Sequence, residues 1–480
     1  MRHRPVEASA LAAILLAGCL FETAPPGRRY PEPDVALPDR WTGADALPGP
    51  VAPGWLETFG DPALTAAVAE AVARNHELAA AAARLDAAAA EARIAGADAW
   101  PQAGAGFSAA RQKQNFIGLP IPGAGDEVLS TRSTRLGVSL DVSWELDLWG
   151  RVRSGHAAAL ADVQAAEADL RAARESLAAQ TAKAWFAAAE ARRQADLARE
   201  AAACYRETAA LVRQRYQEGL SPALDLRQTL GELASAEAFL AQREDQLDRA
   251  RRQLEILLGR YPAGSLEAAA DLASVPPPVP AGLPAELVAR RPDLAAAERR
   301  LAAAGARVDQ ARAALYPRLS LTTTGGTSSD ALRDLVDLDY SVWTLAANLT
   351  QPIFQGGRLL AGVDAAEAGA RAALETFHAA ALKAYGEVET ALATETFLAR
   401  QERELAAAAE QAVAARRLSE ERYRTGVDSL RAWLIARRRA IEAESQWRAA
   451  RRLRLDARVN LHLALGGGFA AAPGAGAAAP

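Results

Sequence analysis

Histidine and cysteine, two side chains that often act as metal ligands or nucleophiles, are both scarce in this 480-residue chain. Histidines occur at positions 3, 76, 156, 378 and 462, and no two of them are four residues apart, as a helical metal pair would be. The glycine run Gly466–Gly468 precedes an Ala/Gly/Pro tail instead of a helix, so it lacks the context of a phosphate-binding loop. The sequence therefore predicts that the protein is not an enzyme and holds no metal or organic cofactor.

The two cysteines point to different roles. One pair of cysteines cannot build a disulfide framework or a cysteine-based zinc site. Cys204 lies in an Ala-rich helical stretch, which is typical of a small buried apolar residue. Cys19 lies near the amino terminus, after a basic start and a short apolar run that ends at Leu16. That run is too short to span a bilayer and is typical of a targeting segment.

The residues Leu16-Ala17-Gly18-Cys19 resemble the lipobox at which bacterial lipoprotein precursors are acylated and cleaved. We therefore expect a lipoprotein signal peptide over residues 1–18 and a covalent lipid on Cys19, with no other cofactor. The alternative is an ordinary signal peptide with an incidental cysteine. A Pro-rich stretch follows up to residue 54, and it is expected to be an extended tether.

Composition favours long helices and disfavours nucleic acid as a partner. Half of the residues are apolar, and many of these are alanines, which favour helices that pack closely. The formal net charge is only −4, and the arginines are interleaved with acidic residues, so no face for a polyanion is expected.

The sequence contains two copies of one pattern. Asn75–Leu78 matches Arg291–Leu294 at an offset of 216 residues (294 − 78). The Arg-Tyr-x-x-Gly motif of Arg215–Gly219 recurs at Arg422–Gly426 with an offset of 207 residues (426 − 219). Because an internal duplication sets the architecture, both copies are expected to fold alike.

Each copy is predicted to contain a helix, two strands, a very long helix, a turn and a returning helix. A first helix is expected over Thr65–Asp98, and it ends before Pro101 because the residue preceding proline disfavours helix. Apolar and polar residues alternate from Leu136 to Leu148, which predicts a strand. The helical pattern from about Arg153 to Tyr216 predicts a helix roughly 95 Å long, at about 1.5 Å per residue. Its counterpart is expected over Leu359–Tyr423.

A long strand with one apolar and one polar face suits a membrane β-barrel, which needs about 9 to 11 residues per crossing. A half-buried strand of a soluble protein is the alternative. Four strands per chain cannot close a sheet whose edges would meet lipid, so chains must pool their strands. Two chains would supply eight and three would supply twelve. On the polar face, Asp141, Glu145 and Asp147 suggest an interior that prefers cations.

The predicted organisation has six parts. These are a signal peptide at 1–18, a lipid-anchored Pro-rich tether at 19–54, a first repeat at 55–261, a Pro-rich linker at 262–284, a second repeat at 285–466 and a low-complexity tail at 467–480.

Taken in order, these features resemble the TolC-type outer membrane factor family, in particular its lipid-anchored branch that pairs with efflux pumps. The resemblance runs from Leu16 to Gly466. It rests on the lipobox, the paired Arg-Tyr-x-x-Gly motifs, Trp55-x-x-x-Phe59-Gly-Asp61-Pro62-x-Leu64, Trp144-Glu-Leu-Asp-Leu-Trp-Gly-Arg151 and Tyr316-Pro-Arg-Leu-Ser-Leu321.

The resemblance implies a mainly α fold with membrane β: a long coiled-coil α-helical barrel, and four β-strands per chain contributing to a trimeric 12-stranded β-barrel. It implies a homotrimer in the bacterial outer membrane, in contact with outer membrane lipid and extending into the periplasm. The expected function is passive conduction of substrates that an inner-membrane pump delivers through a periplasmic adaptor protein. The alternatives are the exit duct of a type I protein secretion system and a lipid-anchored envelope coiled coil that conducts nothing.

In the family, the helical tips contact the adaptor and close the channel at rest. That role falls here on Gly219, Leu220, Ser221, Gly426, Val427 and Asp428. Asp225 matches the family pattern as a possible gate residue, or it is a solvated aspartate at a helix start. The family often has an acidic entrance ring, and the matching position here is the apolar Ile435, so the sequence leaves open whether such a ring exists.

Overall fold

The computed structural model describes residues 38, 40–42, 49, 51, 53–116, 129–267, 269–282 and 284–469. All of these residues belong to the unit Leu37–Pro480. The predicted signal peptide, Cys19, most of the tether and the tail from residue 470 lie outside the described residues. Among the described helices, none combines the length and the apolar character that a membrane span requires.

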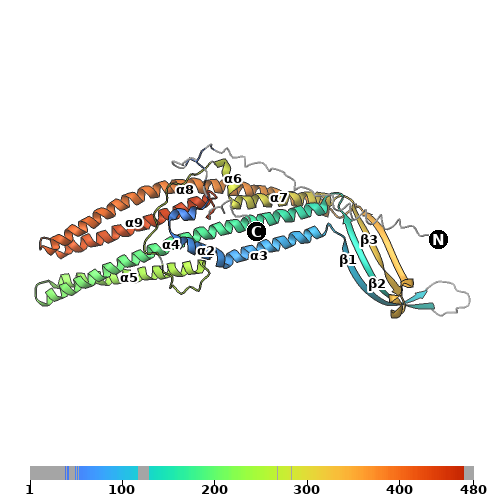
Figure 1. The fold of residues 1–480 in the computed structure, drawn as a ribbon, viewed down its shortest axis with the longest axis horizontal. Coiled ribbons are helices and arrows are strands. Elements are labelled where there is room, and N and C mark those ends of the chain that lie inside the picture. Colours follow the sequence, from blue (N-terminus) through green and yellow to red (C-terminus); the bar gives the residue numbers. More distant parts are fainter. Residues whose placement is uncertain are drawn as a thin grey trace, which may run out of the picture. The chain divides into compact units, whose positions relative to one another are not determined.

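The same arrangement of elements occurs twice along the chain (Figure 1). The first copy contains α2 (Pro62–Arg74), α3 (His76–Ala97), β1 (Gln102–Phe116), β2 (Leu129–Leu146), α4 (Arg151–Gln217) and α5 (Ala223–Leu257). The second contains α6 (Leu287–Arg290), α7 (Pro292–Ala313), β3 (Arg318–Ser329), β4 (Ser341–Thr350), α8 (Arg358–Arg424) and α9 (Leu430–Ala464). Short 3-10 helices are η2 (Trp55–Phe59), η3 (Pro284–Glu286), η4 (Leu332–Val336) and η5 (Leu338–Tyr340).

The long helices have equal lengths in the two copies. Both α4 and α8 have 67 residues, and both α5 and α9 have 35. At about 1.5 Å per residue the longer pair extends about 100 Å, as predicted. Helix α4 packs along α5, and α8 packs along α9. Figure 1 shows these hairpins in green and in orange to red, with their turns at the ends remote from the strands.

The prediction of one unbroken helix over Thr65–Asp98 is wrong at Asn75, where α2 ends and α3 begins. The Asn75 side chain accepts hydrogen bonds from the backbone N–H groups of Glu77 (2.9 Å) and Leu78 (3.1 Å), which caps α3. It also donates to the carbonyl of Leu257 (3.2 Å), the last residue of α5. This contact with α5 helps to fix the break.

The second copy makes the equivalent contact with a different side chain. Arg291 takes the place of Asn75 and donates to the carbonyl of Ala464 (3.2 Å), the last residue of α9. Its guanidinium also pairs with Asp293 and Glu387, each at 2.7 Å. The duplication therefore extends to which carbonyl is bound, although the chemistry of the binding residue differs.

The four strands form one antiparallel sheet in the order β1-β2-β3-β4. Strand β2 is longer at its start than the alternation predicted, and it ends at Leu146, so the expectation that the strand reaches Leu148 is wrong. The chain turns at Asp147, whose carboxylate accepts the N–H of Arg153 (2.8 Å) in the first turn of α4. Apolar residues thus continue past the point where the sheet ends.

The two larger buried clusters of the described residues lie within the helical part. The first contains aromatic residues of η2 and α4 together with leucines of α2, α5 and α9, among them Trp55, Phe59, Phe186, Leu254 and Leu455. The second joins α6 and α7 to α8 and α9 through Leu287, Leu294, Val388 and Leu461. Many buried residues of α4 are alanines, which lets neighbouring helices approach closely.

The Pro-rich linker predicted at 262–284 is fastened to the helices in its described part. Glu255 accepts backbone N–H groups of Gly264 (2.6 Å), Ser265 (2.9 Å) and Leu266 (3.0 Å). Farther along, Arg448 of α9 pairs with Asp271 at 2.7 Å. Since these bonds come from both α5 and α9, the linker joins the two hairpins as well as the two repeats.

Candidate functional site

The turn between α4 and α5 contains the first set of predicted tip residues. Gly219 adopts a left-handed backbone with φ 73°, which glycine tolerates and which ends α4. The N–H of Leu220 returns to the carbonyl of Arg215 (2.7 Å). Leu220 and Leu224 are 71% and 63% exposed. This turn therefore presents apolar side chains to the surroundings.

The turn between α8 and α9 has the same backbone and a different set of side-chain contacts. Gly426 has φ 75°. The Asp428 carboxylate accepts two hydrogen bonds from the guanidinium of Arg422, at 3.0 and 3.1 Å. The rings of Tyr423 and Trp433 stack with centroids 5.3 Å apart and planes 1° apart. An ion pair and an aromatic stack thus brace this turn on either side of its glycine.

Among the described residues, no such ion pair or aromatic stack braces the first turn. At the offset of 207 residues, Ser221 replaces Asp428 and Leu226 replaces Trp433. The tip residues that the sequence predicted are therefore placed at two turns with unequal stiffness. Arg422 and Tyr423 belong to the predicted Arg-Tyr-x-x-Gly motif, but their side-chain contacts at the tip were not predicted. Trp433 was not predicted at all, although comparing the two copies position by position would have singled it out.

The possible gate residue Asp225 lies in the first turn of α5 and is exposed. A carboxylate there faces the positive end of the helix dipole, which suits the helix-start interpretation as well as a gate. Ile435 lies on α9 and is 36% exposed. Its exposed side chain is apolar, so it brings no charge to this position.

The sheet has one apolar and one polar face. Paired residues on neighbouring strands project to the same side, and Val138 pairs with Phe107 while Trp144 pairs with Leu321. The polar face instead pairs Asp141 with Thr324 and Ser139 with Gly106. The apolar face is exposed in the single chain, with Leu140 55% and Leu345 65% exposed. The alternation predicted from the sequence is therefore present in the sheet.

Two of the three carboxylates expected on the polar face are neutralised. Arg151 donates two hydrogen bonds of 2.9 Å to Glu145. Asp147 lies past the end of β2 and contacts Arg153. Asp141 accepts hydrogen bonds only from the hydroxyls of Ser139 (2.8 Å) and Thr324 (2.7 Å) among the interactions of the described residues. Asp141 therefore keeps its charge on this face.

Aromatic residues gather where the strands meet the helices. Trp149 stacks on Tyr316 with ring centroids 5.0 Å apart and donates to the carbonyl of Pro317 (2.9 Å). Trp144 donates to the carbonyl of Ala99 (3.0 Å), and Trp100, which follows Ala99 in the chain, is 61% exposed. Such residues are enriched at membrane–water interfaces. This end of the sheet is therefore suited to the boundary between lipid and water.

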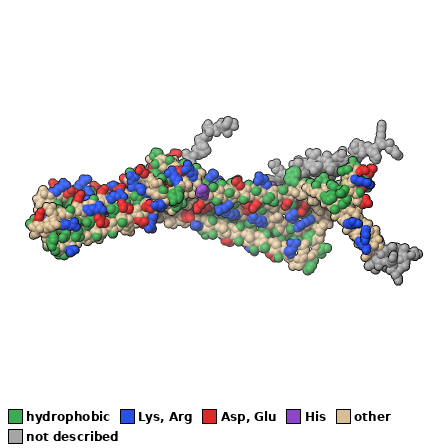
Figure 2. Space-filling view, turned by 90° about the horizontal axis from the view of Figure 1, so that it is seen from below, with side chains coloured by type: hydrophobic (Ala, Val, Ile, Leu, Met, Phe, Trp, Pro, Cys, Tyr) green, Lys and Arg blue, Asp and Glu red, His purple; other side chains and the backbone are tan. Residues whose placement is uncertain are grey.

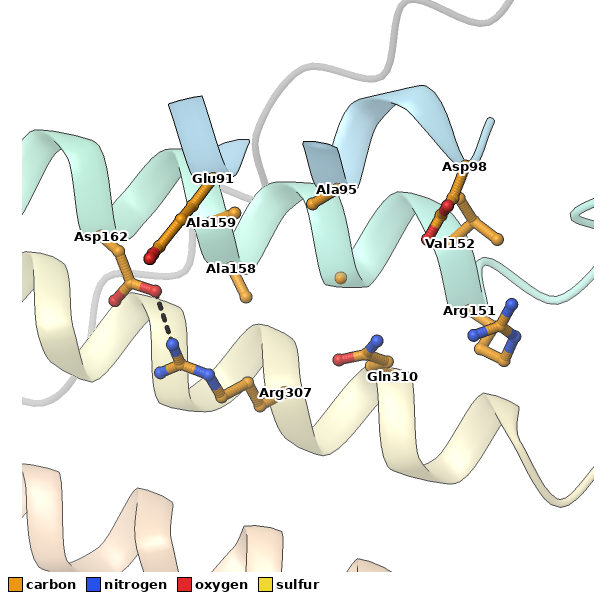
Figure 3. Close-up of a pocket in the computed structure, with 11 residues that line it drawn as sticks. Glu91, Ala95, Asp98, Arg151, Val152, Ala158, Ala159, Asp162, Arg307 and Gln310 are labelled. Carbon is orange, nitrogen blue, oxygen red and sulfur yellow. Dashed lines mark hydrogen bonds and ion pairs between the residues drawn. The ribbon is translucent and has the colours of Figure 1, made fainter. Parts of the chain in front are cut away.

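A hollow of about 260 Å³ lies between α3, α4 and α7 (Figure 3). Arg307 pairs with Asp162 across it, and Arg151 at its edge pairs with Glu145. Both cations are thus used within the chain, so the described residues that line the hollow offer no free cation to an anionic ligand. In the part of the chain that the structure describes, no group of three or more His, Cys, Asp or Glu could hold a metal ion.

Two buried groups bear on chemistry in the helical part. Cys204 is 2% exposed and burial raises the pKa of its thiol, which confirms its interpretation as a buried apolar residue. His462 is 4% exposed and stacks on Trp55 with ring centroids 5.7 Å apart. Burial and the nearby Arg458 lower the pKa of His462 from 6.5 to about 4, so it is neutral at pH 7.

Known proteins match this chain on both repeats. The pattern of the family described as outer membrane efflux protein matches residues 67–260 and 283–467, one stretch in each copy. The chain belongs to the outer membrane efflux protein family. The predicted resemblance is thereby confirmed. Figure 2 shows Lys and Arg interleaved with Asp and Glu along the helices, as the sequence predicted.

Relatives within the outer membrane efflux protein family match nearly the whole chain. The pyoverdine export outer membrane protein OpmQ of Pseudomonas putida is 34% identical over 452 residues, covering 92% of this chain and 94% of OpmQ. The outer membrane protein OprJ of Pseudomonas aeruginosa is 34% identical, covering 96% and 95%. The open state of the MtrE outer membrane channel of Neisseria gonorrhoeae has a TM-score of 0.80 at 30% identity, covering 93% and 98%.

These neighbours confirm the predicted fold class of the efflux protein. Long helices form the helical part, and each chain contributes four antiparallel strands to a trimeric β-barrel.

Proposed function

We propose that this efflux protein is the outer membrane channel subunit of a tripartite efflux system. It forms a homotrimer that passively conducts what an inner-membrane pump delivers through a periplasmic adaptor protein, and it has no enzymatic activity of its own. The observation that carries the proposal is the placement of a two-faced sheet at one end of two helices of about 100 Å, with unequal turns at their other ends. A membrane duct needs the sheet, and a periplasmic partner meets the turns first.

The proposal includes opening at the turns. Gly219, Leu220 and Ser221 would contact the adaptor together with Gly426, Val427 and Asp428, and Asp225 stands beside them as a possible gate residue. The exposed apolar side chains of the first turn support the adaptor contact, because exposed apolar patches commonly mark interaction sites. The braced second turn supports a role in holding the closed state.

The proposal also covers the amino terminus. A signal peptide over residues 1–18 would be removed, and the lipid on Cys19 together with a tether over residues 19–54 would anchor each subunit in the outer membrane. The lipobox supports this step. No cofactor other than this lipid is proposed.

Native mass spectrometry of the detergent-extracted protein tests both assembly and anchor. Three chains, each starting at an acylated Cys19, are the expected result. Monomers or dimers without lipid would instead favour the lipid-anchored envelope coiled coil that conducts nothing.

Crosslinking tests opening at the turns. A Ser221→Cys, Val427→Cys variant that forms disulfides between neighbouring subunits should lose export when oxidised and regain it when reduced. Export by the oxidised, crosslinked protein would contradict gating at the turns. If the oxidised, crosslinked variant loses protein secretion while drug and metal efflux are unchanged, the type I secretion duct would be favoured.

A further inference from the structure

The β1–β2 hairpin extends past the rest of the sheet. Pairing of β2 with β3 ends at Leu136 and Ser329, but β1 and β2 remain paired through to Phe116 and Leu129. Seven residue pairs, from Ala110–Arg135 to Phe116–Leu129, make up this extension, which we call the hairpin arm. Among these fourteen residues, four are Lys or Arg and none is Asp or Glu.

Three of the four cations lie on the same side of the arm as the apolar face of the sheet. Counting in steps of two from Phe107 reaches Arg111 and Lys113. Arg132 lies directly opposite Lys113, and Arg135 is on the other face. All four side chains are exposed, and among the described residues no carboxylate pairs with Arg111, Lys113 or Arg132. Figure 2 shows blue side chains on the arm.

The height of the three cations follows from the strand geometry. Leu136 and Leu146 bound the apolar face of β2 and are ten residues apart (146 − 136), about 33 Å along a strand and about 24 Å across a bilayer at a tilt of about 45°. This matches the apolar band of about 25 Å in outer membrane barrels. Arg132 lies four residues farther (136 − 132), about 9 Å beyond the band at the same tilt, which is the depth of lipid headgroups.

Lys113 and Arg132 also face each other as a like-charged pair. Residues directly opposite on antiparallel strands have Cβ atoms about 5 Å apart, and like charges there are destabilising. An anion held between the two would relieve this repulsion. Phosphate suits the position, because guanidinium groups bind phosphate oxygens with two parallel hydrogen bonds.

We propose that Arg111, Lys113 and Arg132 bind phosphate groups of the anionic lipids in the outer leaflet of the outer membrane. The inference rests on the proposed function, since it needs the apolar face of the sheet to meet lipid. Each subunit then holds a lipid phosphate at the rim of the barrel, and the hairpin arm is fixed at that height.

Lipid binding to the full-length oligomer in detergent tests the proposal. The probe is lipid A with both phosphates, titrated and counted per chain by native mass spectrometry, with lipid A stripped of both phosphates beside it. Replacing Arg111, Lys113 or Arg132 singly by Gln should weaken binding about fivefold, and the triple variant on the order of a hundredfold, at about 1 kcal/mol per cation near a lipid surface. Arg135→Gln is the matched control, because it removes one charge from the opposite face, and it should bind like the wild type.

Three outcomes would overturn the proposal: equal binding by the triple variant and the wild type, equal loss in Arg135→Gln and Arg111→Gln, or equal binding of the phosphate-free lipid. Conductance in bilayers of zwitterionic lipid is measured in parallel. If the wild type conducts there and one of the three binding outcomes is found, only the lipid site is refuted. If it forms no pores, the proposed channel function fails instead.

Discussion

The ion pair in the second turn leads to a quantitative prediction. Asp428→Asn keeps the shape of the side chain but removes the charge that accepts two hydrogen bonds from Arg422. The Arg422 side chain is 59% exposed and that of Asp428 is 25% exposed, so solvent screens the pair. With a two-bond geometry the loss should be about 1 kcal/mol, at the upper end for surface pairs, which makes local opening of the turn about fivefold more frequent.

Hydrogen exchange of the assembled protein measures this opening. The amides of Gly426 and Val427, which bond to the carbonyls of Tyr423 and Arg422, should exchange about fivefold faster in the variant. Ser221→Ala at the equivalent position of the first turn is the matched control, and it should leave the exchange rates of the Gly426 and Val427 amides unchanged. Equal exchange in the wild type and in Asp428→Asn would refute the argument that the ion pair stiffens this turn.

Three further variants test other parts of the structure. A Cβ on Gly326 would stand 1.9 Å from the carbonyl oxygen of Val138. Gly326→Ala should therefore destabilise the folded sheet by about 1 to 3 kcal/mol and lower the temperature at which the oligomer dissociates in SDS. Gly325→Ala is the control and should leave that temperature unchanged, because a Cβ there meets nothing within 4 Å. Asp141→Asn should reduce cation selectivity in planar bilayers, whereas replacing Glu145 and Arg151 together by Gln should leave it nearly unchanged, because that ion pair carries no net charge. The contribution of His462 to the free energy of unfolding is complete above pH 6.5. It falls as the pH drops from 6.5 toward 4, because in that range the histidine takes up a proton in the unfolded state but stays neutral in the folded state. Burial raises the pKa of Asp456 to about 6, so between pH 6 and 4 the folded state takes up this proton first, and Asp456 offsets the loss of stability caused by His462. Asp456→Asn removes this offset, so the free energy of unfolding of the variant should fall by about 1.4 kcal/mol per pH unit on acidification through that window. Thermal melts of the helical signal measure this fall.

The long helices and the two-faced strands could be predicted because their signals are local and repeated. No residue between Arg153 and Tyr216 breaks a helix, and α4 extends only slightly beyond these bounds. Alternation of apolar and polar residues placed β2, although not its end. The duplication then transferred both assignments to the second copy.

What the sequence concealed depends on contacts across turns. Arg422 with Asp428, Glu145 with Arg151 and Asp147 with Arg153 are each six residues apart, a spacing that brings side chains together in neither a helix nor a strand. These pairs form only after the chain has turned back. The break at Asn75 is similar, because the carbonyl of Leu257 that it binds lies 182 residues away.

The difference between the two turns changes the symmetry of the ring that three subunits make. Two alike hairpins per chain would give six equivalent members related by a sixfold rotation. Of the two turns, as far as their described residues show, the α8–α9 turn alone carries an ion pair and an aromatic stack. The members therefore alternate between stiff and compliant, and the rotation is reduced to threefold. Such a ring can change its aperture by moving three members past three that hold their shape, without every contact around the circle having to break at once.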